Sequence, residues 1–406
     1  MSPEPVAITG MGLVTPAGSD VESNIDRVWS GASTARRDPR LAGVPVDFSC
    51  YIAAADPAAD APRTTPWTMG RSGLLGVAAA WQAVHDAGMK PSEWDGARVA
   101  VIVGTAFGDL AEFESAQRRM LDGSEEPSSL LTVLAPVNMT AAYIAMECQA
   151  LGPNEVVSSA CASGATAVGR ARSLLQAGLC DIAIAGGSEA SLTPTVMASL
   201  ARKGALSRRV DDPSAACRPF DTDRDGLVAG EGAGMVVLER GADAAARGAR
   251  IRAWVSGFGA SADGHHPARP DPTGSGAERA VRAALADAGL PPSDVGHVNA
   301  HGTSTALNDV IESRLIDRVF GHGPAVTSTK GVTGHLIGAA GAVEIIYAAL
   351  ALERQSVPPT ANLYRLDPQV DVDIVTRRPR AAALEAAVSH SFGFGGQNAV
   401  TVLTRA

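Results

Sequence analysis

The 406-residue sequence has no run of about 18 uninterrupted apolar residues, which is the length that a helix needs to cross a bilayer. Its N-terminal stretch, MSPEPVAITGMG, lacks the charged start and the apolar centre of a secretion signal. These absences argue against membrane insertion and export. They predict a soluble, cytoplasmic protein with no membrane partner.

Cysteine is scarce, and no two cysteines stand in a CxxC pair. The five cysteines are an odd number, scattered along a chain that is long enough to fold without disulfide cross-links. This usage is typical of a reducing compartment. We therefore consider each thiol as an unpaired cysteine; the five are Cys50, Cys148, Cys161, Cys180 and Cys217.

Positive charge is also limited, since the formal net charge is -9 at pH 7. The Arg clusters are short and interrupted, so the sequence predicts no nucleic-acid partner. The only lysines are Lys90, Lys203 and Lys330. Aromatic residues make up 4% of the chain against 46% for all hydrophobic residues, so Ala, Val, Leu and Ile must supply most of the core.

The sequence does contain an internal repeat. DAGMKPS (residues 86–92) returns as DAGLPPS (residues 287–293), each between an Ala-rich helical stretch and a Val-rich strand. Three more pairs of segments line up: VAITGMG with AWVSGFG, VVSSACASG with AVTSTKGVTG, and GEGAGMVVLERG with GFGGQNAVTVLTRA. We interpret these pairs as two related halves, residues 1–247 and 248–406, of an α/β fold with largely parallel strands covered on both faces. The first half carries extra length around residues 31–75 and 105–150, where we expect pocket and subunit contacts.

The most unusual stretch is SSACASGATAVG, because it places Cys161 between a strand-like run and a helix-like run. Backbone N–H groups and the macrodipole at a helix N-terminus favour a thiolate, so Cys161 is a candidate nucleophile. The alternative is a buried structural cysteine, which is how we interpret the other four.

The repeat brings further candidates to the same place. The second half offers Lys330 and His335 in STKGVTGHLIGAAGAVE, and His301 in NAHGTSTALND, each where a strand ends. Strand ends of related halves meet at one face of such folds, where α/β proteins bind ligands. One thiol and two imidazoles are therefore predicted to converge.

Motifs along nearly the whole chain now resemble one family in order and spacing: VAITGMGLVTPAG, SSACASG, AGGSEA, RPFDTDRDGLVAGEGAGMVVLE, NAHGTSTALND, STKGVTGHLIGAAGAVE and SFGFGGQNA. They resemble the β-ketoacyl-acyl-carrier-protein synthases, in the branch of elongating condensing enzymes that use Cys-His-His. The resemblance implies a thiolase-like fold, with two duplicated α/β halves in a five-layered α-β-α-β-α arrangement.

The resemblance also implies a role for each matching residue. Cys161 would accept the acyl group, while His301 and His335 would be the two catalytic imidazoles. Lys330 would be the catalytic-site lysine, and Phe394 the gate whose N–H forms the oxyanion hole with that of Cys161. The other matches are Thr303, Thr305 and Phe392, which would contact the phosphopantetheine arm of the substrate, and Glu344, which would balance Lys330.

The implied reaction is acyl transfer to Cys161, followed by decarboxylative condensation with a malonyl thioester. It would elongate a fatty acyl or polyketide chain, and it needs no metal or redox cofactor. The expected partners are an acyl carrier protein and either a second copy or a chain-length-factor subunit. ALND resembles type II polyketide ketosynthases more than fatty-acid enzymes. Because carrier proteins are acidic, we expect docking at Arg202, Lys203, Arg208 and Arg209, unless these residues form an ordinary solvated loop.

Other classes fit less well. A non-catalytic chain-length factor would lack Cys161, and a thiolase would need a second Cys where Phe392 and Phe394 stand. Initiating condensing enzymes have Asn where this chain has His335. An unrelated cysteine hydrolase would not need two imidazoles in duplicated positions. DTDRDG begins like a calcium loop, but its twelfth position is Gly232, so no metal is predicted.

Overall fold

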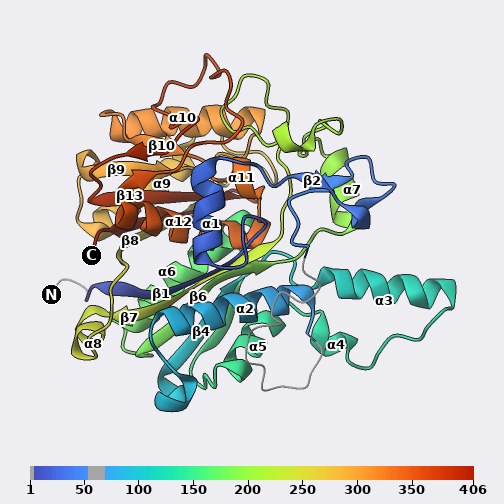
Figure 1. The fold of residues 1–406 in the computed structure, drawn as a ribbon, viewed down its shortest axis with the longest axis horizontal. Coiled ribbons are helices and arrows are strands. Elements are labelled where there is room, and N and C mark those ends of the chain that lie inside the picture. Colours follow the sequence, from blue (N-terminus) through green and yellow to red (C-terminus); the bar gives the residue numbers. More distant parts are fainter. Residues whose placement is uncertain (1–3, 54–68) are drawn as a thin grey trace.

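The computed structural model describes residues 4–53 and 69–406, and a ten-stranded sheet dominates this part of the chain (Figure 1). In spatial order its strands are β10 (Ala325–Thr327), β9 (Val295–Asn299), β13 (Ala386–Gly393), β14 (Gln397–Thr404), β8 (Ala253–Ala262), β1 (Val6–Val14), β7 (Gly232–Arg240), β6 (Ile182–Glu189), β4 (Val99–Gly104) and β5 (Asn154–Val157).

The sheet consists of two five-stranded groups with matching order. Strands β5-β4-β6-β7-β1 correspond to β10-β9-β13-β14-β8. Three of the four pairs of repeated segments fall on corresponding strands, and the fourth, residues 86–92 and 287–293, lies between corresponding helices and strands. The groups join through three residue pairs, between residues 6–8 of β1 and residues 253–255 of β8. The fold is thus duplicated as expected, while the boundary between residues 247 and 248 stays a prediction.

Strand direction differs from the expectation. Five of the nine neighbouring pairs in the described sheet are antiparallel, so the prediction of largely parallel strands is wrong. Only β4, β5 and β6, and likewise β9, β10 and β13, run parallel. The Val- and Ile-rich runs report burial on both faces of the sheet, and such burial does not determine strand direction.

Helices cover both outer faces and fill the space between the two strand groups. The central layer holds α6 (Ser163–Gln176) and α12 (Ala340–Arg354), whose residues form one hydrophobic cluster with strands of both groups. Helices α2 (Arg71–Asp86) and α5 (Met139–Glu147) cover the first group, and α9 (Ser275–Ala288) and α10 (Ala306–Phe320) cover the second. The expected α-β-α-β-α order of layers is therefore present (Figure 1).

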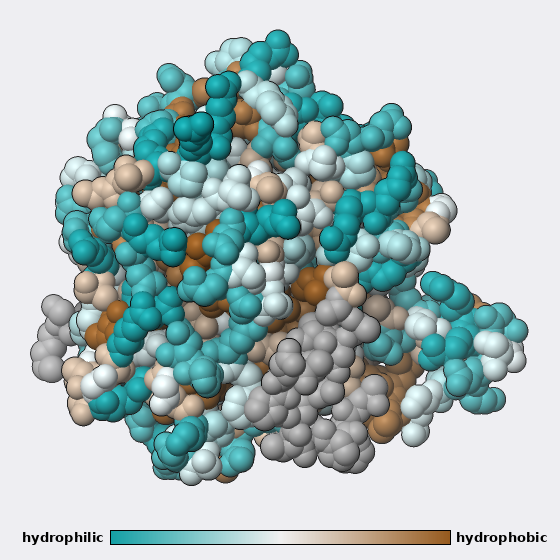
Figure 2. All heavy atoms as spheres, in the orientation of Figure 1, coloured by the Kyte–Doolittle hydropathy of each residue, from teal (hydrophilic) through white to brown (hydrophobic). Residues whose placement is uncertain are grey.

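The remaining elements are short or peripheral: α1 (Val21–Ser30), α3 (Leu110–Asp122), α4 (Leu131–Leu134), α7 (Pro194–Arg202), α8 (Gly241–Ala246), α11 (Lys330–Thr333), β2 (Arg36–Arg37), β3 (Phe48–Ser49), β11 (Ser356–Val357) and β12 (Arg380–Ala381). Of the two expected insertions, residues 54–68 of the first lie outside the described residues. The second forms α3, α4 and α5, and Figure 2 shows α3 standing out from the body with apolar atoms at its base. Among the helices of residues 4–53 and 69–406, none combines the length and hydrophobicity of a membrane span.

Candidate active site

Cys161 lies in the turn between β5 and α6, where the sequence predicted it. Ala160, just before it, has a φ of 51°, a left-handed conformation that is uncommon for a residue with a side chain. Ser163 stabilises this turn, because its Oγ donates to Ala160 O (2.6 Å) and accepts from Ser159 N–H (2.9 Å). The side chain of Cys161 is buried, with 6% exposure.

A close approach of the two central helices brings Cys161 toward the second half. A Cβ atom at Gly164, near the start of α6, would lie 2.7 Å from the backbone N of Ala342 in α12. Only glycine permits this spacing without displacing α12. The small residues after Cys161 therefore serve helix packing, and this packing places the thiol beside the segment that carries Lys330 and His335.

His335 lies between α11 and α12, in a segment fixed by backbone hydrogen bonds. Its N–H donates to Val228 O at 2.7 Å, and its carbonyl accepts from Gly230 N–H at 2.9 Å. The ring Nδ1 accepts a hydrogen bond from Ile337 N–H at 3.3 Å. Because Nδ1 is an acceptor, the proton of the neutral ring lies on Nε2, which is then a donor.

His301 follows β9 in a loop that a buried carboxylate holds. Glu312 of α10 accepts the backbone N–H groups of His301 and Gly302, each at 2.7 Å. The same carboxylate contacts His390 Nδ1 at 3.0 Å. Nδ1 of His301 is buried and has no hydrogen-bond partner within the described residues, so the ring is available to a ligand.

One cavity of about 510 Å³ contains all three predicted reactive groups, Cys161, His301 and His335. The two imidazole rings meet edge to face, with centroids 5.3 Å apart and an interplanar angle of 85°. Four other predicted residues line the same cavity: Thr303, Thr305, Phe392 and Phe394. The structure thus brings together residues that are up to 233 positions apart in the chain (161 to 394).

Burial and the charge of Lys330 control protonation in this cavity. Burial lowers the pKa of His301 and of His335 well below the ordinary imidazole value, and the Lys330 ammonium lowers both further. Both rings are therefore neutral at pH 7. Burial raises the pKa of the Cys161 thiol to about 11, against the opposing effects of Phe394 N–H and Lys330. The resting group is therefore the thiol, because desolvation of the charged form outweighs the neighbouring groups that favour a thiolate.

This thiol pKa predicts the pH dependence of Cys161 alkylation by iodoacetamide. Only the thiolate reacts, so the rate should rise about tenfold for each pH unit between pH 7 and 9, with no plateau. Quantifying the alkylated Cys161 peptide by mass spectrometry, with N-acetylcysteine as the reference thiol, measures this slope. A plateau near neutral pH would instead indicate a preformed thiolate.

Lys330 and Glu344 form the predicted buried pair. The Lys330 ammonium contacts Glu344 Oε1, and neither side chain is more than 3% exposed. Burial raises the pKa of Glu344 to about 7, while the charge of Lys330 acts to lower it. Glu344 thus compensates a cation that would otherwise be too costly to bury, and the cation in turn keeps the imidazoles neutral.

Phe394 lies in the turn between β13 and β14, against the Cys161 turn. A Cβ atom at the preceding Gly393 would lie 2.7 Å from Ser159 O and 3.1 Å from Cys161 N. This close packing points Phe394 N–H at the thiol, where it favours the thiolate. Phe392 packs edge to face against His301, with 5.8 Å between ring centroids. The N–H groups of Cys161 and Phe394 are therefore suitably placed to bind one oxyanion.

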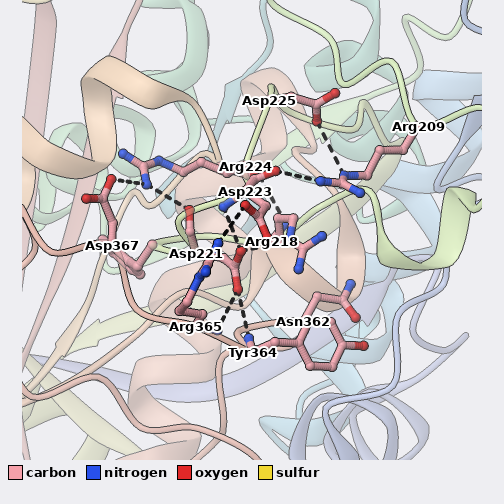
Figure 3. A network of polar contacts seen from close by, with 12 residues as sticks. Arg209, Arg218, Asp221, Asp223, Arg224, Asp225, Asn362, Tyr364, Arg365 and Asp367 are labelled. Atoms are coloured by element: carbon pink, nitrogen blue, oxygen red, sulfur yellow. Dashed lines mark hydrogen bonds and ion pairs between the residues drawn. The ribbon is translucent and has the colours of Figure 1, made fainter.

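A charged network holds the neighbouring threonine loop (Figure 3). Arg224 donates to Thr305 O at 3.1 Å and to Ala306 O at 3.0 Å, and it pairs with Asp367 at 2.7 Å. Thr303 Oγ1 and Thr305 Oγ1 lie 2.9 Å apart at the cavity wall. Thus the DTDRDG segment, whose metal-binding resemblance was rejected, positions the loop of the predicted arm-binding residues.

The predicted docking residues follow α7 at the cavity mouth. Arg202, Lys203 and Arg208 are exposed, and Lys203 lines the cavity itself. Arg209 is partly buried, and it donates to Asp223 O at 2.7 Å. Of these four residues, Lys203 is the one that reaches the opening of the cavity.

Sequence reasoning missed three residues that position the site: Glu312, Arg224 and Glu189. Glu189 Oε2 accepts from Ala106 N–H (2.8 Å) and Gly338 N–H (3.3 Å), and it thereby joins the loop after β4 to the segment after His335. Burial raises the pKa of Glu189 to about 7. All three lie inside motifs quoted above or just after them, so their places in these motifs were the available signal.

Comparisons with known proteins agree over the full length. Residues 3–244 match the family described as beta-ketoacyl synthase, N-terminal domain, and residues 252–364 match beta-ketoacyl synthase, C-terminal domain. The chain is 39% identical to 3-oxoacyl-[acyl-carrier-protein] synthase 2 of Synechocystis sp., over 97% of this chain and 96% of that protein.

Two solved structures are similar over 100% of both chains. One is the ishigamide ketosynthase/chain length factor, with a TM-score of 0.93 and 33% identity. The other is a type II polyketide synthase acyl-carrier protein in complex with its ketosynthase bound to the hexaketide, with a TM-score of 0.91 and 30% identity. The expected thiolase-like fold is confirmed.

Proposed function

Because this chain belongs to the β-ketoacyl synthase family, we propose that Cys161, His301 and His335 carry out both half-reactions of a carbon–carbon condensation. The protein is a β-ketoacyl-acyl-carrier-protein synthase, an acyltransferase that acts on carrier-bound thioesters. The observation that carries the residue roles is the single cavity in which one thiol faces two neutral imidazoles.

In the first half-reaction, Cys161 Sγ attacks the acyl thioester while a neutral imidazole of the cavity accepts the thiol proton. Since the resting group is a thiol with a raised pKa, attack and proton transfer must be coupled. The oxyanion accepts hydrogen bonds from Cys161 N–H and Phe394 N–H. Its collapse leaves the acyl group on Sγ and expels the thiol of the carrier arm, which takes up the proton.

In the second half-reaction, the bound malonyl thioester loses carbon dioxide, and negative charge develops on its thioester oxygen. His335 Nε2–H and the ring of His301 stabilise this enolate. The enolate carbon attacks the acyl carbonyl on Cys161, the C–S bond breaks, and the leaving Cys161 thiolate takes up one proton from solvent. Neutral rings suit this step, because an imidazolium would protonate the carbanion before it reacts.

We also propose that the reaction needs no cofactor and takes place in the cytoplasm. The departing carbon dioxide generates the carbanion, so neither a metal nor a redox cofactor takes part. Thr303, Thr305 and Phe392 contact the arm, while Arg202, Lys203, Arg208 and Arg209 receive the acidic carrier protein. We place the enzyme in the cytoplasm, where fatty-acid and polyketide precursors are made.

A second candidate is a ketosynthase subunit that works only with a chain-length-factor partner. Full-length similarity to the ishigamide ketosynthase/chain length factor favours it. Exposed apolar side chains on α3 and α4 offer a surface that a partner subunit could cover, at Phe113, Met120, Leu121 and Val133. A second copy of the chain could cover the same surface.

One assay separates these candidates. The purified protein is incubated with acyl- and malonyl-carrier proteins, with and without the co-encoded partner subunit, and products are identified by mass spectrometry. We expect a β-ketoacyl thioester in at least one combination. Formation without the partner supports fatty-acid elongation, and strict dependence on it supports the polyketide role. Hydrolysis of the thioester with no condensation would contradict both.

A further inference from the structure

A surface lysine touches the aromatic residue beside the nucleophile. Lys203 directly follows helix α7, and its Nζ lies 3.8 Å from the ring centroid of Phe394. A cation on the face of an aromatic ring is attracted by the ring's quadrupole. Phe394 N–H faces the Cys161 thiol, so this contact links the solvent-exposed cavity mouth to the reactive sulfur.

Among the four predicted docking residues, Lys203 is the one that lines the cavity. Within the described residues no carboxylate forms an ion pair with it, and its contact with Phe394 is the interaction that the structure records. By contrast, the guanidinium of Arg209 lies 4.0 Å from the Asp225 carboxylate. The Lys203 ammonium is therefore free to pair with an incoming anion.

Two glycines follow Phe394 in the turn between β13 and β14. Gly395 and Gly396 follow it with φ values of 84° and 71°, and glycine changes between such conformations at low cost. Phe394 is 37% exposed, so few contacts other than the one with Lys203 hold its side chain in place. A weak contact can therefore bias the position of the ring.

We propose that Lys203 is a latch, which holds Phe394 at the cavity mouth in the resting enzyme and releases it on pairing with the phosphodiester of the incoming prosthetic arm. This inference rests on the proposed function, because that function supplies the anionic arm. The flexible lysine stem lets the ammonium serve either the ring or an anion, but not both at once. Lys203 is thus a positioning residue, which makes the site more accessible to charged arms than to uncharged thioesters.

Two measurements on Lys203→Met test the latch. Without the ammonium, alkylation of Cys161 by iodoacetamide at pH 9 should become about two- to five-fold faster, as expected for loss of an exposed cation–π contact. Acylation by acyl-pantetheine, which has no phosphate, should rise by a similar factor, while acylation by acyl-phosphopantetheine should fall. Lys203→Arg should behave like the wild type, and Lys90→Met, at an exposed lysine paired with Glu93, is the matched control.

Several results would overturn the latch. Unchanged alkylation, or an equal change with both soluble thioesters, would assign Lys203 no role in gating. A loss seen only with acyl-carrier protein would mean that Lys203 binds carboxylates of the carrier rather than the phosphodiester. Iodoacetamide reacts with Cys161 whether or not acyl transfer occurs, so a wild-type protein that no thioester acylates would contradict the proposed function while the alkylation rates still test the latch.

Discussion

Replacement of Cys161 by alanine is expected to abolish condensation, with a loss of at least about 10⁴-fold, because no other side chain can hold the acyl group between the two half-reactions. Cys161 is the only cysteine that lines the cavity within the described residues. The measurement is the rate of β-ketoacyl thioester formation, together with the intact mass of the protein after incubation with acyl-carrier protein. The variant should show no acyl adduct.

The same variant separates the two half-reactions. Decarboxylation of malonyl-carrier protein depends on the imidazoles rather than on the thiol, so Cys161→Ala should still release carbon dioxide. Cys180→Ala, at a buried cysteine outside the cavity, is the matched control and should condense normally. An acyl adduct on another residue of Cys161→Ala, with condensation retained, would refute the assigned nucleophile.

Replacement of His335 by alanine is expected to lower the decarboxylation rate by about 10²- to 10³-fold, which is typical for loss of one donor to a developing oxyanion. The physical basis is the Nε2–H of His335, whose position follows from the hydrogen bond that Nδ1 accepts from Ile337 N–H. His335→Asn supplies a side-chain N–H in place of the ring and should lose less. Carbon dioxide release from malonyl-carrier protein measures both variants.

Acyl transfer to Cys161 is expected to be affected less than decarboxylation in the His335 variants. His335→Ala should still form the acyl-enzyme at Cys161, because the two oxyanion-hole donors are backbone N–H groups and His301 remains as a proton acceptor. His85→Ala, at an exposed histidine outside the cavity, controls for the loss of an imidazole. Equal losses in His335→Ala and His335→Asn would mean that the ring acts through its basicity rather than as a hydrogen-bond donor.

The sequence predicted the duplicated architecture, because repeated segments of the chain occupy equivalent positions in the two halves of the fold. Corresponding segments such as residues 86–92 and 287–293 occupy matching places beside matching strands, so a one-dimensional pattern identified a three-dimensional duplication. Strand direction could not be predicted in the same way. The residues of β7 and β14 are buried on both faces like those of a parallel sheet, although both strands are antiparallel to their neighbours.

Local motifs predicted which residues meet in the cavity, but not the chemical state of these residues. The pKa of Cys161 depends on desolvation by residues from distant segments, and this effect exceeds the opposing effects of Phe394 N–H and Lys330. Likewise, Glu312 supports His301 through backbone N–H groups, which carry no sequence signature of their own. The contact between Lys203 and Phe394 joins residues 191 positions apart (203 to 394) and follows only from the fold.

The most direct test of the account is a single-turnover chase of the acyl-enzyme. Wild-type protein is loaded with an isotopically labelled acyl group from carrier protein, separated from it, and then mixed with malonyl-carrier protein. We predict that mass spectrometry finds the label first on the Cys161 peptide and then in a β-ketoacyl thioester on the carrier, with release of carbon dioxide. Label on a different residue, or its appearance as free acid while malonyl-carrier protein stays intact, would contradict the shared thiol–imidazole site.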